Sequence, residues 1–294
     1  MSETNYTILK NRGVLEISGE DRKAFLQGLI SNNVDDISEN RAIYAALLTP
    51  QGKYLFDFFI SEISNSLYLD CELNRLDELI KKLSIYKLRA DINLVDRSND
   101  YIVGTIYGET PIDLLQMHEC PGKTRSIYGG KIYVDPRIAA VGFRLMLPRE
   151  QLKNFLNFLP LQEKSEDSFD YLRIMLGLPD GSRDLIPEKS ILLENGFNEL
   201  NGIDWNKGCY MGQELTARTK YRGLIKKRLV PAKIMGPTPL SGATITKAGR
   251  KVGEMRSSLH DIGLALIRTE HICPESLNAG NTELLPMTPN WVKL

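Results

Sequence analysis

The stretch from Asn206 to Arg228 reads NKGCYMGQELTARTKYRGLIKKR, and the fold assignment depends on it. Two glycines, Gly208 and Gly212, bracket Cys209, and glycine lets a backbone turn sharply or approach a ligand closely. The run 213–221 has the pattern of a helix that begins just after the second glycine. Cys209 is therefore expected near the N-terminus of a helix.

The charges of this stretch point to chemistry at Cys209. A helix dipole and the neighbouring Lys207 both favour the thiolate, which is the reactive form of cysteine. Seven basic residues stand against one acid, Glu214, and would attract an anion such as a carboxylate-bearing cofactor tail or a phosphate. They are Lys207, Arg218, Lys220, Arg222, Lys226, Lys227 and Arg228. The same residues also fit a solvated basic helix with a buried, inert cysteine, and the pattern alone leaves both interpretations open.

Toward the N-terminus, apolar residues alternate between the periods of strands and helices. A hairpin turn is expected at Thr49-Pro50-Gln51-Gly52, and Ser18 is expected to cap a helix that Gly28 interrupts. Further strands are predicted at 14–17, 67–70, 90–95, 102–106, 131–134 and 140–147, and further helices at 76–83, 151–158 and 169–176. This order predicts an α+β fold with helices on one side of antiparallel sheets.

Beyond Arg222 the pattern changes to short β-like runs separated by Gly or Pro. They lie at 229–234, 243–246, 251–255 and 262–267. Short strands at such spacing predict a small barrel or sandwich. Two regions are therefore expected, one over residues 1–225 and a small β-barrel over 226–294.

Composition limits the partners of the chain. The 294 residues contain 37 Lys and Arg against 37 Asp and Glu, so no overall field recruits nucleic acid or a membrane. Cys71, Cys120, Cys209 and Cys273 are too scattered for a zinc or thioredoxin-like motif, which favours a reducing compartment. No targeting segment or membrane span is recognisable. A cytoplasmic location in a bacterial cell is expected.

Three weaker signals are interpreted as structural. Pro121-Gly122-Lys123-Thr124 imitates the end of a phosphate-binding loop, but Met117 stands where the first glycine belongs. His118-Glu119-Cys120 has no second cluster to complete a metal site, so no metal site is predicted. His260 and His271 stand alone and are not candidate catalysts.

The octet Lys207-Gly208-Cys209-Tyr210-Met211-Gly212-Gln213-Glu214, followed by Arg218 and Arg222-Gly223, resembles the signature of the YgfZ family. The resemblance continues upstream in the same order as the family landmarks. These are Gly19-Glu20-Asp21, Phe25-Leu26-Gln27-Gly28, the 47–53 hairpin with Asp57, Tyr86-Lys87-Leu88-Arg89, Arg173, Gly177-Leu178-Pro179 and Ile186-Pro187-Glu188. It covers most of residues 8–230 and is weaker in the C-terminal strands.

This resemblance implies the architecture of the glycine-cleavage T-protein. Residues 1–225 would form two intertwined α+β, ferredoxin-like subdomains around a central folate site, with the chain crossing near 45 and at 100–165, and residues 226–294 a barrel. Tetrahydrofolate or a derivative is the implied cofactor. Glu188 after Pro187 matches the glutamate that receives the pterin ring in T-proteins, and a carboxylate can accept two N–H groups from it. The remaining cofactor-binding candidates are Lys207, Tyr210, Gln213, Arg218 and Arg89.

The YgfZ resemblance also implies an accessory function rather than classical catalysis. The family is associated with assembly or repair of iron-sulfur clusters in client enzymes, including a radical enzyme that modifies tRNA. One hypothesis is that Cys209 transiently holds iron, sulfur or a one-carbon adduct, because a thiolate is both a soft ligand and a nucleophile. A permanent cluster is not expected, because clusters usually take four thiolates.

Two alternatives come from other functional classes. An aminomethyltransferase would pass a one-carbon unit to tetrahydrofolate with the help of a carboxylate, for which Asp77 in a first helical turn is the candidate. Asp is also common there because of the helix dipole. RNA contact through the basic stretch, with Tyr210 and Tyr221 interleaved, is disfavoured by the zero net charge.

Overall fold

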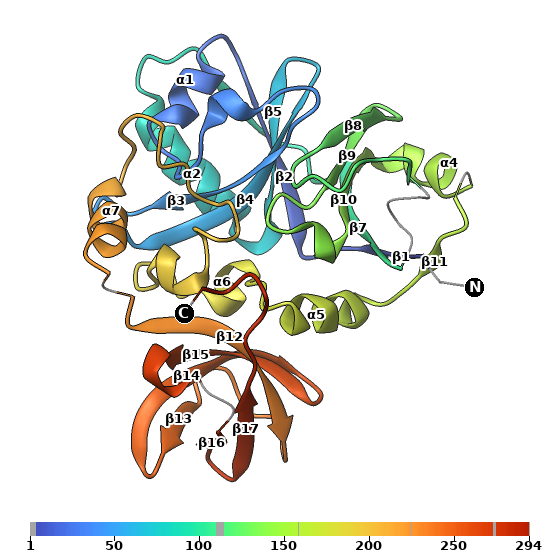
Figure 1. Ribbon diagram of the computed structural model, residues 1–294. Coiled ribbons are helices and arrows are strands. Elements are labelled where there is room, and N and C mark those ends of the chain that lie inside the picture. Colours follow the sequence, from blue (N-terminus) through green and yellow to red (C-terminus); the bar gives the residue numbers. More distant parts are fainter. Residues whose placement is uncertain (1–3, 110–114, 158, 224, 273–274, 294) are drawn as a thin grey trace. The chain divides into compact units, whose positions relative to one another are not determined.

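The computed structural model describes residues 4–109, 115–157, 159–223, 225–272 and 275–293, and it contains two compact units. The first unit comprises Met1–Leu47, Phe56–Glu166 and Asn201–Met211, and the second Leu48–Leu55, Asp167–Leu200 and Gly212–Leu294 (Figure 1). The two are described separately below. Among the described residues, no helix is long and apolar enough to cross a membrane.

The first unit contains a five-stranded sheet with the order β3-β4-β5-β2-β6. Its strands are β2 (Arg12–Ser18), β3 (Ile43–Leu48), β4 (Tyr54–Ile63), β5 (Ser66–Glu72) and β6 (Asn93–Asp96). Two helices accompany it, α1 (Arg22–Gln27) and α2 (Leu76–Lys87), and α2 buries Leu76, Leu79 and Leu83. The predicted strands and helices of this region are confirmed, with shifts of a few residues at their ends.

A second sheet of this unit has six strands in the order β11-β1-β7-β10-β9-β8. Its strands are β1 (Thr4–Ile8), β7 (Tyr101–Gly108), β8 (Thr124–Ile127), β9 (Gly130–Val134), β10 (Phe143–Pro148) and β11 (Gln162–Glu163). Helix α4 (Leu152–Leu156) contributes Phe155 to a core with Ile106, Ile132 and Phe143. Phe158, at the end of the helix predicted here, lies outside the described residues.

A buried group of charges holds strands of the first unit together. Arg12 Nε donates to Asp70 Oδ1 at 2.6 Å, and Arg144 Nε donates to Asp70 Oδ2 at 2.8 Å. The guanidinium of Arg144 also lies 3.9 Å from the ring centroid of Phe59. Since each of these ions is almost fully buried, the carboxylate and the two cations depend on one another for charge balance.

The predicted Ser18 cap of the first helix is wrong. Ser18 ends β2 and pairs with Asn93, whereas α1 begins only at Arg22. Gly19 separates the two because its φ is +103°, and a Cβ there would lie 2.2 Å from Asp91 O. The helix therefore starts after a turn that only glycine can make, and its N-cap residue is Asp21.

The second unit consists of a hairpin turn, short helices and a closed barrel (Figure 1). Its helices are α5 (Glu166–Met175), α6 (Gly181–Asp184) and α7 (Gln213–Tyr221). The barrel has the order β12-β15-β14-β13-β16-β17. Its strands are β12 (Lys227–Met235), β13 (Thr244–Lys247), β14 (Arg250–Leu259), β15 (Ile262–Arg268), β16 (Leu277–Ala279) and β17 (Thr282–Pro286). The α+β class and the C-terminal barrel predicted from sequence are confirmed.

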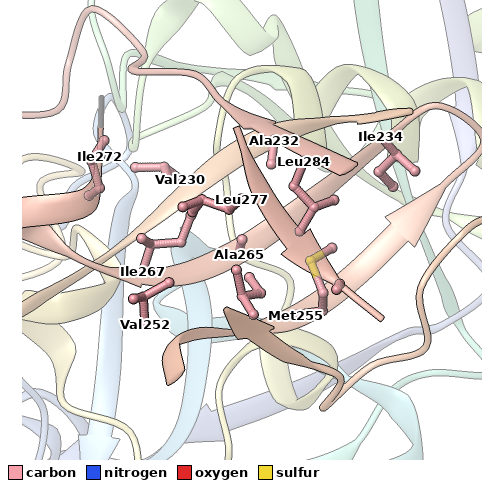
Figure 2. Packing of buried hydrophobic residues seen from close by; sticks show 12 residues of the cluster. Val230, Ala232, Ile234, Val252, Met255, Ala265, Ile267, Ile272, Leu277 and Leu284 are labelled. Atoms are coloured by element: carbon pink, nitrogen blue, oxygen red, sulfur yellow. The ribbon is translucent and has the colours of Figure 1, made fainter. Parts of the chain in front are cut away.

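The barrel interior is filled with aliphatic side chains that point inward from its strands (Figure 2). Val230, Met255, Ala265 and Leu284 are among its fully buried members. Outside the barrel, Ile174 of α5 packs on Leu229, Leu264 and neighbouring residues. The barrel is therefore a packed core and not a ligand channel.

A second buried ion pair joins α5 and α6 to the barrel. Arg173 Nη1 donates to Asp184 Oδ2 at 2.7 Å, and Arg173 Nη2 donates to Ser257 Oγ at 2.9 Å. Ser257 Oγ in turn donates to Asp184 Oδ1 at 2.6 Å. Arg173 also donates to the carbonyl of Leu178 at 3.0 Å. These contacts explain the landmark Arg173 as a structural residue.

Candidate functional site

The segment 202–211 runs along residues 28–32 within the first unit. Hydrogen bonds join the two: Met211 N donates to Gly28 O at 3.0 Å, Asp204 N to Ser31 O at 3.1 Å, and Ser31 Oγ to Gly202 O at 2.6 Å. Ser31 Oγ also accepts from Ala46 N at 2.9 Å, which ties the segment to strand β3. The backbone on both sides of Cys209 is therefore fixed.

The side chain of Lys207 anchors this segment to residues 30 and 32. Its Nζ donates to Ile30 O at 2.8 Å and to Asn32 O at 2.7 Å, and it lies 5.3 Å from the ring centroid of Tyr210. Burial lowers the pKa of Lys207 to about 8, although nearby carboxylates oppose that shift. The ammonium group is thus directed at backbone carbonyls.

Cys209 lies exposed between two anchored neighbours, Lys207 and the buried Tyr210. The alternative of a buried thiol is therefore wrong for this cysteine. Gly208 beside it is exposed, its φ is outside the left-handed region, and a Cβ there would meet no non-adjacent heavy atom of the described chain within 4 Å. Nothing in the fold requires glycine at this position.

Gly212 differs from Gly208 in this respect. Its φ is +80°, and a Cβ there would lie 2.4 Å from Thr49 O. Gly52 in the same hairpin turn would place a Cβ 2.6 Å from Leu215 Cβ. Both glycines are required for the close approach of the hairpin to the start of α7 in the second unit.

The helix predicted over residues 213–221 is confirmed as α7 (Gln213–Tyr221). It begins four residues after Cys209 in sequence, but the helix and the thiol belong to different units. Gln213 is half-buried in its first turn and Arg218 is exposed. These two cofactor-binding candidates are therefore described with the second unit, apart from Lys207 and Tyr210.

Glu188 presents an exposed carboxylate on a fixed backbone in the second unit. Its N–H donates to Tyr54 O at 2.7 Å, and Tyr54 N donates to Ser190 O at 3.0 Å. Its φ is +61°, a left-handed conformation that costs energy in a residue other than glycine. Residues held in this way often cluster at functional sites.

Glu194 was not singled out in the sequence analysis. It lies half-buried in a 3-10 turn, Leu192–Asn195, and burial raises its pKa while Lys227, Lys53 and Arg228 oppose the rise. A perturbed carboxyl group of this kind is a candidate functional residue. The signal in the sequence is one carboxylate directly after the apolar run Ile191-Leu192-Leu193.

Two basic residues of the 206–228 stretch bind groups of the chain itself. Lys207 binds the carbonyls described above, and Arg228 is buried, donating to Glu199 Oε1 at 2.6 Å and to Leu193 O at 2.8 Å. The other five remain exposed: Arg218, Lys220, Arg222, Lys226 and Lys227. The local positive field is thus smaller than the count of basic residues predicts.

Asp77 and Arg89 are both exposed but belong to opposite ends of α2. The 12 residues of this helix span about 18 Å, so the two side chains do not form one site. Asp77 lies in the first turn, where the helix dipole favours a carboxylate. The structure brings together Lys207, Cys209 and Tyr210, and neither Asp77 nor Arg89 joins them.

The weaker motifs carry no site in the described part of the chain. No group of three or more His, Cys, Asp and Glu residues there could hold a metal ion. Gly122 forms a turn with φ +82° and Thr124 begins β8. Cys273 lies outside the described residues.

Comparison with known proteins identifies relatives for both ends of the chain. The family profile "CAF17, C-terminal beta-barrel domain" matches residues 226–294. The mitochondrial iron-sulfur cluster assembly factor IBA57 of Mus musculus is 32% identical, with 96% of this chain and 84% of that protein covered. The protein of the same name from Homo sapiens is 33% identical, with coverage of 90% and 77%.

Among solved structures, the chain resembles the glycine cleavage system aminomethyltransferase T from Bartonella henselae. The TM-score is 0.78 at 11% sequence identity, with 99% of this chain and 87% of that chain covered. This confirms the predicted T-protein fold. At so low an identity the likeness shows the fold alone, and the comparisons lend no support to the aminomethyltransferase alternative.

Two predictions are corrected by these relatives. The similar proteins carry the name IBA57, so the YgfZ resemblance identified a related group of T-protein-like factors and not the matching family. The prediction of a cytoplasmic bacterial protein is wrong, because the matching assembly factors are mitochondrial. Neither the composition nor the four scattered cysteines could distinguish these two reducing environments.

Proposed function

The chain belongs to the IBA57 family of iron-sulfur cluster assembly factors, and from this premise we propose that it presents the Cys209 thiol to iron or sulfur while tetrahydrofolate is bound. The observation that carries the proposal is the exposed thiol between Lys207 and Tyr210, which are both anchored. A thiol in a fixed position, open to solvent, can bind a soft metal without rearrangement of the chain.

The position of Gly208 supports an incoming group at Cys209. Glycine is needed where φ is positive, where the backbone is crowded by its own chain, or where a ligand approaches closely. The first two reasons do not apply to Gly208. The third reason remains, and it supports the approach of a cluster fragment or of a ligating side chain of the client beside Cys209.

Because Cys209 is a single thiol, it can provide only one of the ligands of a cluster. Clusters are usually held by four thiolates, and no other metal-binding group of three or more residues occurs among the described residues. The thiol loses its proton when it binds iron, and the remaining ligands come from the client protein. Cys209 therefore holds its cargo transiently, and client enzymes are required partners. We include among them a radical enzyme that modifies tRNA, on the YgfZ resemblance.

Tetrahydrofolate fits the donor set of the second unit. Glu188 offers an exposed carboxylate on a fixed backbone, and Glu194 offers a half-buried one whose pKa is raised. Either can accept two N–H groups from a pterin ring. Gln213 and Arg218 of α7 add an amide and a cation for the polar tail. When bound, the reduced folate would supply one-carbon chemistry.

The thiol part is tested by reconstituting an apo iron-sulfur radical enzyme that modifies tRNA, with ferrous iron, a sulfide source and this protein. Cluster formation is followed by visible absorbance and by iron and sulfide content. Cys209→Ser is expected to reduce assembly to the level seen without the protein. Cys120→Ser is the matched control, because Cys120 is also an exposed free cysteine but lies in a different segment of the first unit. Normal assembly with Cys209→Ser would contradict the proposal.

The folate part is tested separately by calorimetric titration with tetrahydrofolate. Loss of a charged hydrogen-bond acceptor costs about 1.5–3 kcal/mol, so Glu188→Gln is expected to weaken binding by about tenfold or more. Glu194→Gln is measured alongside, and the control is Glu283→Gln, at an exposed position of β17. A loss confined to Glu194→Gln would move the contact to that residue. If the wild-type protein does not bind tetrahydrofolate, the folate part of the proposal is wrong. The thiol part does not depend on that result.

A further inference from the structure

The barrel carries a hollow whose lining is rich in cations and lies apart from the residues discussed above. It has a volume of about 640 Å³ and includes Lys247, Arg250, Lys251, Arg268, Glu270 and His271 in its lining. These come from the β13–β14 hairpin and from the end of β15, so they share one end of one small domain. The exposed cations Arg250, Lys251 and Arg268 are available to a partner.

The strand pairing brings like charges together around this hollow. Lys247 lies directly opposite Arg250 across the β13–β14 hairpin, and Lys227 lies directly opposite Arg268 in the β12–β15 pair. Like charges at opposed positions destabilise a sheet. The hairpin turn adds strain, because Ala248 has a φ of +48° before Gly249. Like charges and a strained turn therefore occur together at this end of the barrel.

The ion pairs of the hollow show which ligand its cations accept. Lys247 pairs with Glu275, Lys251 with Glu254 at 3.4 Å and Arg268 with Glu270 at 3.7 Å. Each of these cations is therefore already placed to bind a carboxylate. Arg250 differs, because it has no acidic partner among the described residues. Arg250 is therefore the lining cation most open to a carboxylate from a partner.

We propose that this hollow is a docking surface for a protein partner that presents an acidic segment, with one carboxylate on Arg250 and a second on Arg268. An arginine fork binds a carboxylate through two parallel hydrogen bonds. Exposed ion pairs such as Arg268–Glu270 are weak and can exchange one carboxylate for another. A nucleic acid backbone fits less well, because it binds through many cations at once. Of the Lys and Arg residues that line the hollow, Arg250 alone lacks an acidic partner among the described residues.

The surface is tested on the full chain with a fluorescent 12-residue peptide of alternating Glu and Ser, by fluorescence anisotropy. Binding is expected at about 50 mM NaCl and should weaken toward about 300 mM, because exposed charges are screened. The same peptide with Gln in place of Glu should not bind. Arg250→Glu is expected to weaken binding by about fivefold or more. Lys233→Glu, an exposed cation of β12 outside the hollow, should change it by less than about twofold.

Three results would overturn the proposal. The first is no binding of the Glu peptide at low salt. The second is an equal loss for Arg250→Glu and Lys233→Glu, which would reduce the effect to net charge. The third is tighter binding of a 12-nucleotide single-stranded RNA than of the Glu peptide through the same residues. Arg250→Ala, which removes the charge without reversing it, distinguishes loss of the contact from new repulsion.

Discussion

Two regions of the first unit place a cysteine close to a charged residue, but they leave the thiol in opposite environments. In β5, Asp70 precedes Cys71, and both are fully buried. In the 202–211 segment, Lys207 precedes Cys209 by two positions, and only the lysine is directed inward. In both regions the charge is satisfied by the chain itself.

The difference between the regions lies in the thiol. Burial raises the pKa of Cys71 to about 12, and its Sγ lies 3.7 Å from Gly13 O. Cys209 remains exposed because the segment is anchored through its neighbours and not through the thiol. An anchored backbone with an uncommitted side chain is the arrangement expected of a functional group on a rigid support.

The largest expected contrast is in thiol reactivity. At pH 8 a pKa of about 12 leaves about one Cys71 in ten thousand as thiolate, and burial hinders access further. Iodoacetamide should therefore modify Cys209 and the exposed Cys120 while Cys71 stays unmodified, as followed by mass spectrometry of peptides. Labelling in denaturant, where all cysteines react, is the control. Equal labelling of Cys71 and Cys209 in the native protein would contradict the difference in environment between the two thiols.

The second prediction concerns the charge beside Cys71. Asp70→Asn removes the carboxylate that Arg12 and Arg144 share while both cations stay buried, and removal of one partner from a buried ion pair costs about 3–5 kcal/mol. Urea unfolding should show a loss of this size. Asp77→Asn, at an exposed position in α2, should change stability by no more than about 0.5 kcal/mol. Similar losses for both variants would show that the Asp70 network is not a stabilising unit.

Sequence patterns could predict the parts of the fold that depend on neighbouring residues. Short strands separated by Gly or Pro predicted the barrel. The turn residues Thr49–Gly52 predicted the hairpin turn between β3 and β4. The Asp70 network could not be predicted, because Arg12 and Arg144 stand 58 and 74 residues away from the aspartate. A charged residue in a strand gives no local sign of whether its partners are water or distant arginines.

The candidate site was predictable to a similar degree. The residues around Cys209 distinguished it from the other cysteines. They also predicted that Lys207 favours the thiolate of Cys209. The structure directs Lys207 to the carbonyls of Ile30 and Asn32, which lie 177 and 175 residues away. Glu194 was missed because burial, and not a motif, gives it a raised pKa.

The third prediction sharpens the role of Lys207 as an anchor. Lys207→Met removes the donor to two buried carbonyls, which should lower stability by about 2 kcal/mol in urea unfolding. Lys226→Met, an exposed residue of the same basic stretch, is the matched control and should be close to neutral. If both variants unfold at the wild-type urea concentration, Lys207 does not anchor the segment.

A smaller effect is expected in the pH dependence of stability. The pKa of Lys207 falls from 10.5 to about 8 on folding, so the unfolded chain binds more protons between these values. Stability then rises with pH across this window. Relative to Lys207→Met, the wild type should therefore gain stability from pH 8 to pH 10. The gain is reduced by solvent screening because the lysine is only partly buried. Parallel curves for the two proteins would rule out this titration.

The smallest effect on stability is expected for substitutions of Gly208. These substitutions can change function without unfolding the protein. The backbone of Gly208 is acceptable to other residues and no atom crowds it, so Gly208→Ala should raise stability by about 0.4–1 kcal/mol through the unfolded chain. Gly212→Ala is the matched control and should destabilise, because its Cβ would lie 2.4 Å from Thr49 O. If the space beside Cys209 receives a cluster or a client ligand, Gly208→Ala lowers cluster assembly and Gly208→Val lowers it further, although both variants remain folded. Full activity of the valine variant would mean that the space is not used.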